Sequence, residues 1–254
     1  MYKWEPTHVT WRPASQEEIH QFYNTKFQFL FEQNASSFIK SIRTVPEWAC
    51  IDRNEKFIRG TLGKAIQFQT FDELKNFLIE NGAISAYYGT GSLFTVDIDA
   101  KDVAKYAKCE HHPKFGDLKE GSPEFISRLD YIRNLNPRNY PYCFNCISLA
   151  IKGIHKLKQI LLEIGIPENE ILVYFSGQGA HLECTYPRMT ELKKETRGFL
   201  ASYFTTIGIP VDKVVTYGDN RVLRIPGSLH GKVNRIKTLL KPGEEFNVIT
   251  TGVI

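Results

Sequence analysis

Segments with a helical spacing of apolar residues alternate along this chain with short strand-like runs, and this alternation limits the fold more than any other feature. Helices are predicted at residues 15–32, 70–81, 147–164 and 190–207. Strands are predicted at residues 65–68, 85–88, 93–99, 171–175, 181–185, 221–225 and 235–240. Because the two kinds of segment interleave, we expect an α+β (mixed α/β) fold with mixed sheets flanked by helices.

Residues 110–142 interrupt this pattern. They are rich in Pro, Gly, Asn and charged residues and show little periodicity apart from a short predicted helix at 123–134. We therefore expect a single domain over residues 1–254 with an inserted element at about 107–147. The chain shows no internal repeat and no low-complexity segment, which excludes solenoids and disordered tails.

The composition is that of a globular protein. The chain has 254 residues, of which 42% are hydrophobic, enough for an ordinary core. The amino terminus lacks the basic and apolar regions of a signal peptide, and no apolar run reaches the roughly 18–20 residues that span a bilayer. We expect a cytoplasmic protein with no membrane partner.

The positive charge is concentrated toward the carboxyl terminus. Residues 185–241 contain eleven Lys and Arg against four Asp and Glu, a net charge of +7 within a chain whose total is +4. A basic segment of this kind suits a polyanion such as nucleic acid or a triphosphate. A solvated lysine-rich surface is the alternative.

Two aspartates share one face of a predicted strand. In residues 93–99, side chains alternate, so Asp97 and Asp99 point away from the apolar Val96 and Ile98. Two like charges on a semi-buried sheet repel each other, and a site that keeps both ionised usually supplies a cation. Hard oxygen ligands favour Mg²⁺ or Mn²⁺. Two solvated aspartates at a strand end are the structural alternative.

A glycine-containing turn leads into a histidine. Residues 174–181 read YFSGQGAH, in which Gly177 and Gly179 allow the backbone to approach a ligand closely, between Ser176 and His181. Backbone N–H groups and an imidazole could bind phosphate there. A tight hairpin that needs glycine for its shape explains the same residues without a ligand.

A basic strand and its loop follow at residues 220–232, NRVLRIPGSLHGK, which bring His230 and Lys232 together. The loop differs from an ATPase phosphate loop, because the Gly227 to Gly231 spacing is one residue short and Val233 stands where Ser or Thr is required. The Gly89-Thr-Gly91 turn likewise lacks the third glycine of a dinucleotide fingerprint.

Cysteine and histidine residues bracket the insertion. These are Cys109, His111, His112, Cys143 and Cys146. Three thiols and one of the two imidazoles are enough for a structural, tetrahedral Zn²⁺ site, which a loop with little core of its own would need. Free thiols are the alternative. The other two cysteines, Cys50 and Cys184, have apolar neighbours and are predicted to be core residues.

Taken together and in this order, the segments resemble the archaeo-eukaryotic primase superfamily, specifically archaeal DNA primase catalytic small subunits and plasmid primase-polymerases. The resemblance rests on residues 96–99 (VDID), the Cys/His cluster, residues 176–181 (SGQGAH), and residues 211–216 (VDKVVT) leading into residues 223–232 (LRIPGSLHGK). It covers most of the chain from about residue 57 onward. The chain departs from the family in its short segment between His181 and Asp212 and in its long insertion.

The resemblance implies a catalytic core in which Asp97, Asp99 and a third acid hold two Mg²⁺ or Mn²⁺ ions. By its position the third acid is Asp212, with Asp219 as the second choice. It further implies that the incoming triphosphate is held by the glycine turn and the basic loop, through Ser176, Gly177, Gly179, His181, His230 and Lys232. Charge and strand position alone add Arg221 and Arg224.

The expected activity is that of a DNA primase/polymerase, a template-directed nucleotidyltransferase of DNA replication. Its expected substrates are NTP or dNTP, single-stranded DNA template and primer-template duplex. A primase large subunit or a fused or associated helicase is an expected partner, in an archaeal, plasmid or viral context. Two alternatives stay open: a gap-filling repair polymerase of the same superfamily, and a non-catalytic zinc-containing nucleic-acid-binding module.

Overall fold

The structure, a computed structural model, describes residues 14–60, 64–107, 144–218, 221–243, 246–247 and 251–252. These residues form helices packed on two sheets, which confirms the α+β class. Every strand pairing among them is antiparallel, so the prediction of mixed sheets was wrong. Sequential strands such as β5 (Ile171–Phe175) and β6 (Gly179–Cys184) are joined by a turn too short for the crossover that a parallel pair requires.

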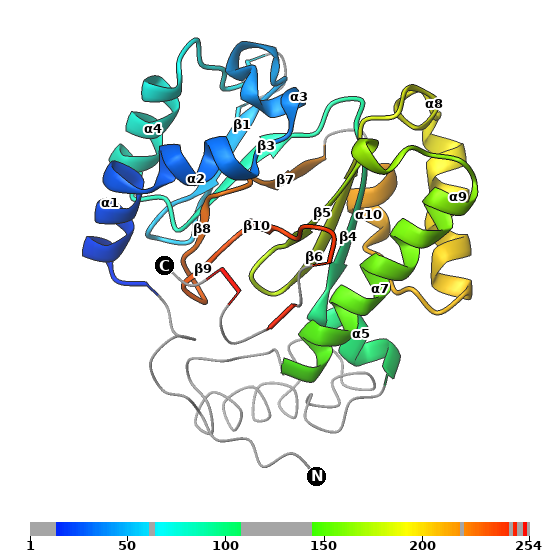
Figure 1. Ribbon diagram of the computed structural model, residues 1–254. Helices are drawn as coiled ribbons and strands as arrows, with labels where there is room; N and C mark the ends of the chain where they lie inside the picture. Colours follow the sequence, from blue (N-terminus) through cyan, green and yellow to red (C-terminus); the bar gives the residue numbers. More distant parts are fainter. Residues whose placement is uncertain are drawn as a thin grey trace, which may run out of the picture.

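The first sheet, with its helices, forms the first lobe (Figure 1). Within the described residues its six strands are β1 (Trp48–Ile51), β2 (Phe57–Ile58), β3 (Ser85–Gly89), β7 (Val222–Arg224), β8 (Leu229–His230) and β9 (Arg235–Ile236). The helices are α1 (Gln16–Thr25), α2 (Phe27–Asn34), α3 (Ser37–Lys40) and α4 (Phe71–Glu80), with the 3-10 turn η1 (Ile42–Thr44). Their apolar faces, with Phe22, Phe27 and Leu74, pack against Trp48 and Leu223 of the sheet in one hydrophobic core.

The second sheet, with its helices, forms the second lobe. Its four described strands run in the order β10 (Thr238–Leu239), β5, β6 and β4 (Phe94–Asp99). The helices are α5 (Ala100–Ala107), α7 (Phe144–Glu163), α8 (Pro187–Thr190), α9 (Lys194–Thr206) and α10 (Lys213–Tyr217), with the 3-10 turn η2 (Glu168–Glu170). Ile151 and Ile154 of α7 pack with Val96, Ile98 and Leu182 of the sheet. Within the described part of the chain, no helix has the length and apolarity to cross a bilayer.

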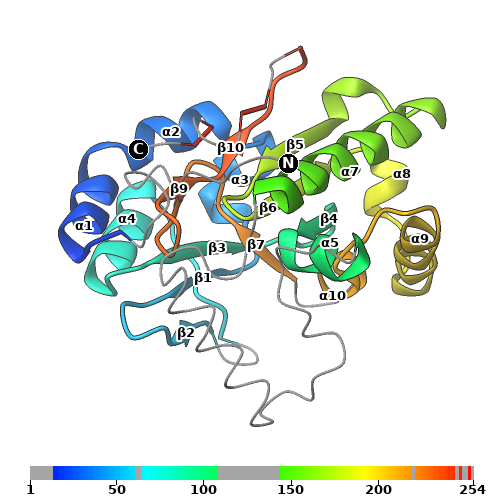
Figure 2. The ribbon, with the colours of Figure 1, turned by 90° about the horizontal axis from the view of Figure 1, so that it is seen from below.

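The two sheets meet through a polar layer, which we call the interlayer. One side of it is the face of the four-stranded sheet that carries Thr95, and side-chain contacts across it join the lobes. Figure 2 shows β7 and β10 between the two lobes. Arg221, just before β7, donates a hydrogen bond to Thr95 of β4 (3.2 Å), and Tyr174 of β5 donates to the carbonyl of Asn34 (3.1 Å). The chain itself passes from the first sheet to the second at Lys237, between β9 and β10.

Several predicted elements differ from the structure. The helix expected over residues 15–32 is two helices, which meet at Lys26, a residue with φ −110° that ends α1 and precedes α2. Residues 65–68 are not a strand; the Ile66 carbonyl accepts one hydrogen bond from the Trp48 N–H (2.8 Å), but no ladder continues from it. Strands β1 and β2 were not predicted, and the loop expected after Gly227 contains β8.

The predicted insertion over residues 107–147 lies, apart from its two ends, outside the described residues. The same holds for the helix predicted at 123–134 and for four of the five expected zinc ligands, Cys109, His111, His112 and Cys143. The fifth, Cys146, is buried in the first turn of α7. The zinc site therefore stays a prediction.

Candidate active site

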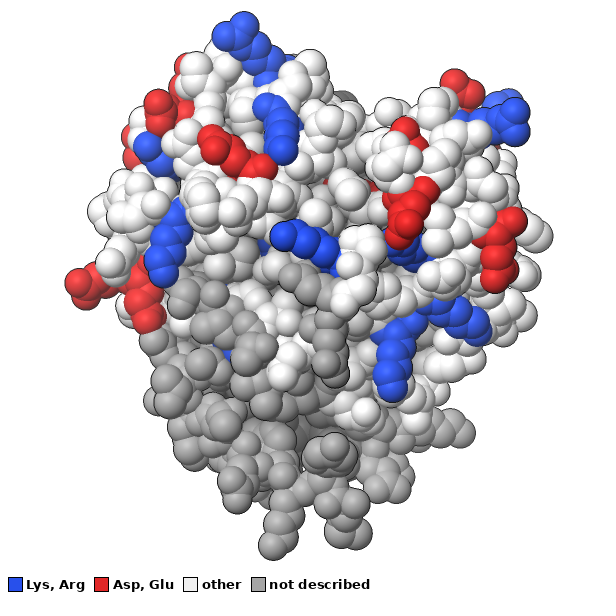
Figure 3. Space-filling view, in the orientation of Figure 1, with Lys and Arg blue, Asp and Glu red and all other residues white. Residues whose placement is uncertain are grey.

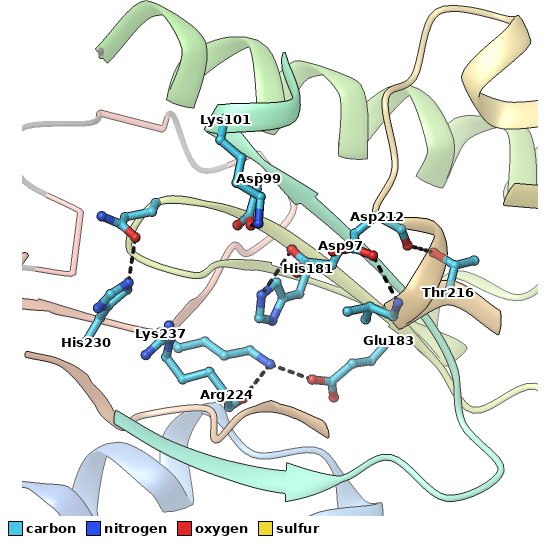
Figure 4. Close-up of polar contacts among 12 residues, drawn as sticks. Asp97, Asp99, Lys101, His181, Glu183, Asp212, Thr216, Arg224, His230 and Lys237 are labelled. Carbon is cyan, nitrogen blue, oxygen red and sulfur yellow. Dashed lines mark hydrogen bonds and ion pairs between the residues drawn. The ribbon is translucent and has the colours of Figure 1, made fainter. Parts of the chain in front are cut away.

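Strand β4 has the alternation that the sequence predicts. Phe94, Val96 and Ile98 are buried in the core of the second lobe, so Thr95, Asp97 and Asp99 face the opposite side, toward the interlayer. Figure 4 shows the two aspartates following each other along this strand. Asp97 is largely buried, whereas Asp99 lies at the strand's end, where its carboxylate forms an ion pair with Lys101 (2.7 Å).

Strand β6 brings His181 beside the first aspartate. In the antiparallel register Asp97 is opposite His181, and Asp99 is opposite Gly179. His181 Nε2 lies 3.4 Å from Asp97 Oδ1, a contact that lacks hydrogen-bond geometry. The strands approach closely because residue 179 has no side chain: a Cβ there would overlap the carbonyl oxygen of Ile98. Glycine at this position is thus explained by the strand pairing.

Asp212 reaches the same place from a segment more than a hundred residues away in the sequence. Its N–H donates to the carbonyl of Asp97 (2.8 Å), and its Oδ1 caps α10 by accepting from the N–H groups of Val214 (2.8 Å) and Val215 (3.1 Å). In Figure 4 the Asp212 and Asp97 side chains lie side by side at the start of this helix. The structure thus brings together the three acids Asp97, Asp99 and Asp212. Asp219, the second choice, lies outside the described residues.

The negative charges at this cluster are only partly balanced. Burial raises the pKa of Asp97 well above its ordinary value, and the charges of Asp99 and then Asp212 raise this pKa further, while Lys101 opposes them. Among the described residues, Asp97 Oδ1 is a buried oxygen that accepts no hydrogen bond. A buried carboxylate oxygen of this kind, next to two further carboxylates, fits a hard divalent cation.

The carboxylates do not form a finished coordination shell. Across the described ranges, no group of three or more His, Cys, Asp or Glu side chains has the arrangement of a metal site. Lys101 holds Asp99, and the N-cap hydrogen bonds hold one oxygen of Asp212. The oxygen ligands of the three acids are of the type that the expected metal ions prefer, and these carboxylates would have to rearrange to bind them.

The glycine turn contacts the basic loop across the interlayer. Gly177 has φ +99°, and a Cβ at this position would lie 2.9 Å from Cδ2 of His230. His230 Nε2 is 2.9 Å from the Gln178 Oε1. Ser176 is buried at the beginning of the turn, and its N–H donates to the Gly179 carbonyl (3.0 Å). The glycine turn and the basic loop, which are separate motifs in the sequence, therefore form one site.

Both histidines are held in the neutral form. Burial lowers the pKa of His181 well below its usual range, and the charges of Lys237, Arg224 and His230 lower it further. Burial, then Arg224 and Lys232, lower the pKa of His230 in the same way. Each ring has a buried Nδ1 with no hydrogen-bond partner among the described residues. Neutral imidazoles with an unused nitrogen can donate to or accept from a ligand.

The three predicted basic residues have different surroundings. Arg221 is buried and donates to the carbonyls of Gly91 (3.0 Å) and Leu93 (2.9 Å) as well as to Thr95, so it joins parts of the fold. Arg224 donates to Ser85 Oγ (2.8 Å). Lys232 is exposed and pairs with Glu55 (2.8 Å), a surface contact that is weak enough to be exchanged for a ligand.

Part of the positive charge of the basic segment is buried. Four of its cations, Arg221, Arg224, Arg235 and Lys237, are buried. Figure 3 shows both signs of charge scattered over the described part of the visible face, and a notch between the two lobes. Sequence reasoning related this charge to a polyanion such as nucleic acid or a triphosphate, with a solvated surface as the alternative, and did not identify the four cations that are buried. It also missed Glu183, which alternation places on the same face of β6 as His181, and its partner Lys237.

Comparison with known proteins gives distant matches. No family model matches the chain. The chain is 23% identical over 225 residues to the DNA primase small subunit PriS of Sulfolobus acidocaldarius, covering 70% of the chain and 65% of that protein. PriS of Saccharolobus solfataricus is likewise 23% identical, over 226 residues with the same coverage. An uncharacterized DNA primase small subunit-like protein of Archaeoglobus fulgidus is 34% identical over 89 residues, 35% of the chain and 31% of that protein.

These matches span less than two thirds of the length of the curated relatives. They agree with the resemblance that residues 96–99, 176–181 and 223–232 carry in the sequence. The chain is therefore distantly related to the archaeal DNA primase small subunits.

Proposed function

We propose that the chain is a DNA primase/polymerase that joins nucleotides on a DNA template by two-metal catalysis. The single observation that supports this most is the convergence of Asp97, Asp99 and Asp212, which come from a strand and from a distant helix N-terminus. A buried carboxylate next to two further carboxylates is costly, and a bound cation would offset that cost.

Asp97, Asp99 and Asp212 would hold two Mg²⁺ or Mn²⁺ ions. When bound, such ions activate an attacking 3′-hydroxyl and neutralise the charge of the leaving pyrophosphate. The chain's own contribution is to hold the carboxylates: β4 fixes Asp97 and Asp99, and the cap of α10 fixes Asp212. Lys101 would leave Asp99 when the cations arrive, since it occupies one carboxylate oxygen.

The triphosphate of the incoming nucleotide would bind beside the acids. Ser176 and the backbone of Gly177 and Gly179 form the turn, and His181 and His230 supply neutral ring nitrogens next to it. Lys232 would exchange Glu55 for a phosphate. Arg221 makes internal hydrogen bonds and is better explained as part of the fold, whereas Arg224 lies close enough to both histidines to lower their pKa values.

Single-stranded DNA template and primer-template duplex are the proposed nucleic-acid partners. Support comes from the relatives, which are named DNA primase small subunits. A large subunit or an associated helicase, and a structural Zn²⁺ in the insertion, are part of the same proposal. Template binding through backbone phosphates should weaken as salt concentration rises.

A primer-extension assay tests the proposal. Wild-type protein, Asp97→Asn and Asp99→Asn are each incubated with primed template, dNTPs or NTPs, and Mg²⁺ or Mn²⁺. Each substitution removes one charge from the metal site, so we expect extension to fall at least about 100-fold. Asp72→Asn is the control, because Asp72 is an exposed acid on α4 paired with Lys75, and it should extend normally.

Wild-type-like extension by Asp97→Asn would remove the metal assignment. The same assay without a primer separates two activities of the superfamily: products on an unprimed template indicate primer synthesis, and extension of primed template alone indicates a gap-filling polymerase. Absence of any extension, with nucleic-acid binding retained in both variants, would favour the non-catalytic binding module.

A further inference from the structure

Lys237 and Glu183 form an ion pair inside the interlayer. The distance between Lys237 Nζ and Glu183 Oε1 is 2.7 Å, and both side chains are completely buried. The same ammonium donates to the Arg224 carbonyl (2.9 Å) and lies over the rings of Tyr174 (4.3 Å to the centroid) and Tyr88 (5.7 Å). Figure 4 shows the pair between the strand that carries His181 and the segment that carries Arg224.

A pair of this kind is an unusual choice if only stability matters. Removing two charges from water costs several kcal/mol per ion, and well-packed apolar residues of similar volume often serve the fold equally well. What the pair adds is a fixed geometry, since the ammonium is held by a carboxylate, a carbonyl and two aromatic faces. The position of this pair in the fold therefore indicates what the pair does besides stabilising the protein.

The pair connects the two parts of the proposed active site. Glu183 lies two residues after His181 on the same face of β6, and its register partner is Thr95, two residues before Asp97. On the other side, the Lys237 N–H donates to the Ser228 carbonyl (3.0 Å) and its own carbonyl accepts from Gly227 (2.8 Å), directly before the strand with His230. One buried contact thus joins the sheet with the acids to the loop with His230 and Lys232.

The positive charge of Lys237 also acts on residues of the proposed active site. Lys237 is one of the groups that lower the pKa of His181, and the carboxylate of Asp97 acts on the pKa of Lys237 in turn. Both effects mean that the ammonium lies within electrostatic range of the acids and of the histidine. The chain crosses from one sheet to the other at this residue, so a change in its position would move β9 and β10 against each other.

We propose that Lys237 and Glu183 are positioning residues, which set the spacing between the carboxylate-bearing sheet and the His230–Lys232 loop and thereby the affinity for the nucleotide triphosphate. This inference rests on the proposed function. Neither residue contacts the nucleotide. The contact between Lys237 and Glu183 fixes the separation of His181 and His230 across the interlayer, and both residues act through these histidines.

The test uses a double substitution, Glu183→Met with Lys237→Met, which replaces both charges by apolar chains of similar length. The control is Glu168→Gln with Lys158→Met, because Lys158 and Glu168 form an ion pair of the same length (2.7 Å) away from the interlayer. Thermal unfolding, and kcat and KM for nucleotide in primer extension, are measured for each full-length protein. We expect the double variant to fold, its KM for nucleotide to rise about tenfold, and kcat to change less.

The control pair should leave KM within about twofold of the wild-type value. A folded double variant with wild-type KM would overturn the inference while leaving the proposed function intact. If the double variant does not fold, Glu183→Asp decides by the same criterion, since it keeps both charges but draws the carboxylate back by one methylene. A wild-type protein that extends no primer contradicts the proposed function itself, and the inference with it.

Discussion

Asp97 holds a carboxylate in a buried position beside two other acids. Burial is the largest cause of its raised pKa, followed by the charges of Asp99 and Asp212. A side chain with a pKa raised by folding contributes stability below its unfolded pKa, and this contribution is lost as the pH rises through the folded value. Without metal, the fold therefore disfavours the ionised form of Asp97.

Asp97→Asn should accordingly stabilise the metal-free protein while it abolishes activity. We expect a gain of about 1–3 kcal/mol in the free energy of unfolding at neutral pH, because the buried charge is removed. The gain should shrink as the pH falls, since the wild-type carboxyl then becomes protonated. Thermal unfolding in EDTA over a series of pH values measures this difference.

Asp72→Asn is the control, because Asp72 is an exposed acid paired with Lys75 outside the cluster, and its removal should give no such gain. Addition of Mn²⁺ should raise the unfolding temperature of the wild-type protein and not that of Asp97→Asn. If Asp97→Asn is less stable than the wild-type protein at neutral pH, the Asp97 carboxylate makes favourable interactions in the metal-free fold, which contradicts this prediction.

The pairing of β4 and β6 is the element on which the site depends. Over six register pairs it sets Asp97 opposite His181 and Asp99 opposite Gly179. At the last pair the strands are so close that a side chain at residue 179 would overlap the Ile98 backbone. The pairing of β4 with β6 therefore explains both the positions of the two aspartates and the glycine at residue 179.

Gly179→Ala should destabilise the protein by about 1–3 kcal/mol, because the added methyl group has to displace backbone. Gly198→Ala is the contrasting control: this glycine is inside α9, its Cβ would make an ordinary contact with Tyr217 (3.8 Å), and alanine in a helix is favoured by about 0.5–1 kcal/mol. Chemical denaturation of both variants gives the two free energies. Equal or greater stability of Gly179→Ala would show that the strands can separate without cost.

Elements with strong local signals were predictable from the sequence. Helix α4 begins after Thr70 as its capping residues predict, and strand β5 occupies the predicted residues 171–175. The strand predicted at residues 235–240 is two strands of two residues each, β9 and β10, which belong to different sheets. Strand β8 was not predicted; it is two residues long and pairs with β9 and with the distant β3, so its local pattern is weak. Strand β1 pairs with β3 across more than thirty residues and was missed for the same reason.

The candidate site was predictable to the extent that its residues stand in motifs. Alternation identified the shared face of Asp97 and Asp99, and the resemblance to primases identified Asp212. Net charge, in contrast, cannot reveal which cations are buried, so neither a polyanion partner nor a solvated surface, the two interpretations of the basic segment, accounts for the fully buried Arg235 and Lys237. The contact between Lys237 and Glu183 depends on the packing of two sheets, which no single segment encodes.

At the scale of the whole molecule, the central claim is that acids from two distant segments bind the catalytic ions together. Primer extension by Asp212→Asn tests it most directly, because asparagine still caps α10 and the substitution removes the charge without removing the helix. The account predicts a folded protein whose extension rate with Mg²⁺ or Mn²⁺ is at least about 100-fold below wild type. A folded Asp212→Asn protein that extends primers at the wild-type rate would contradict it.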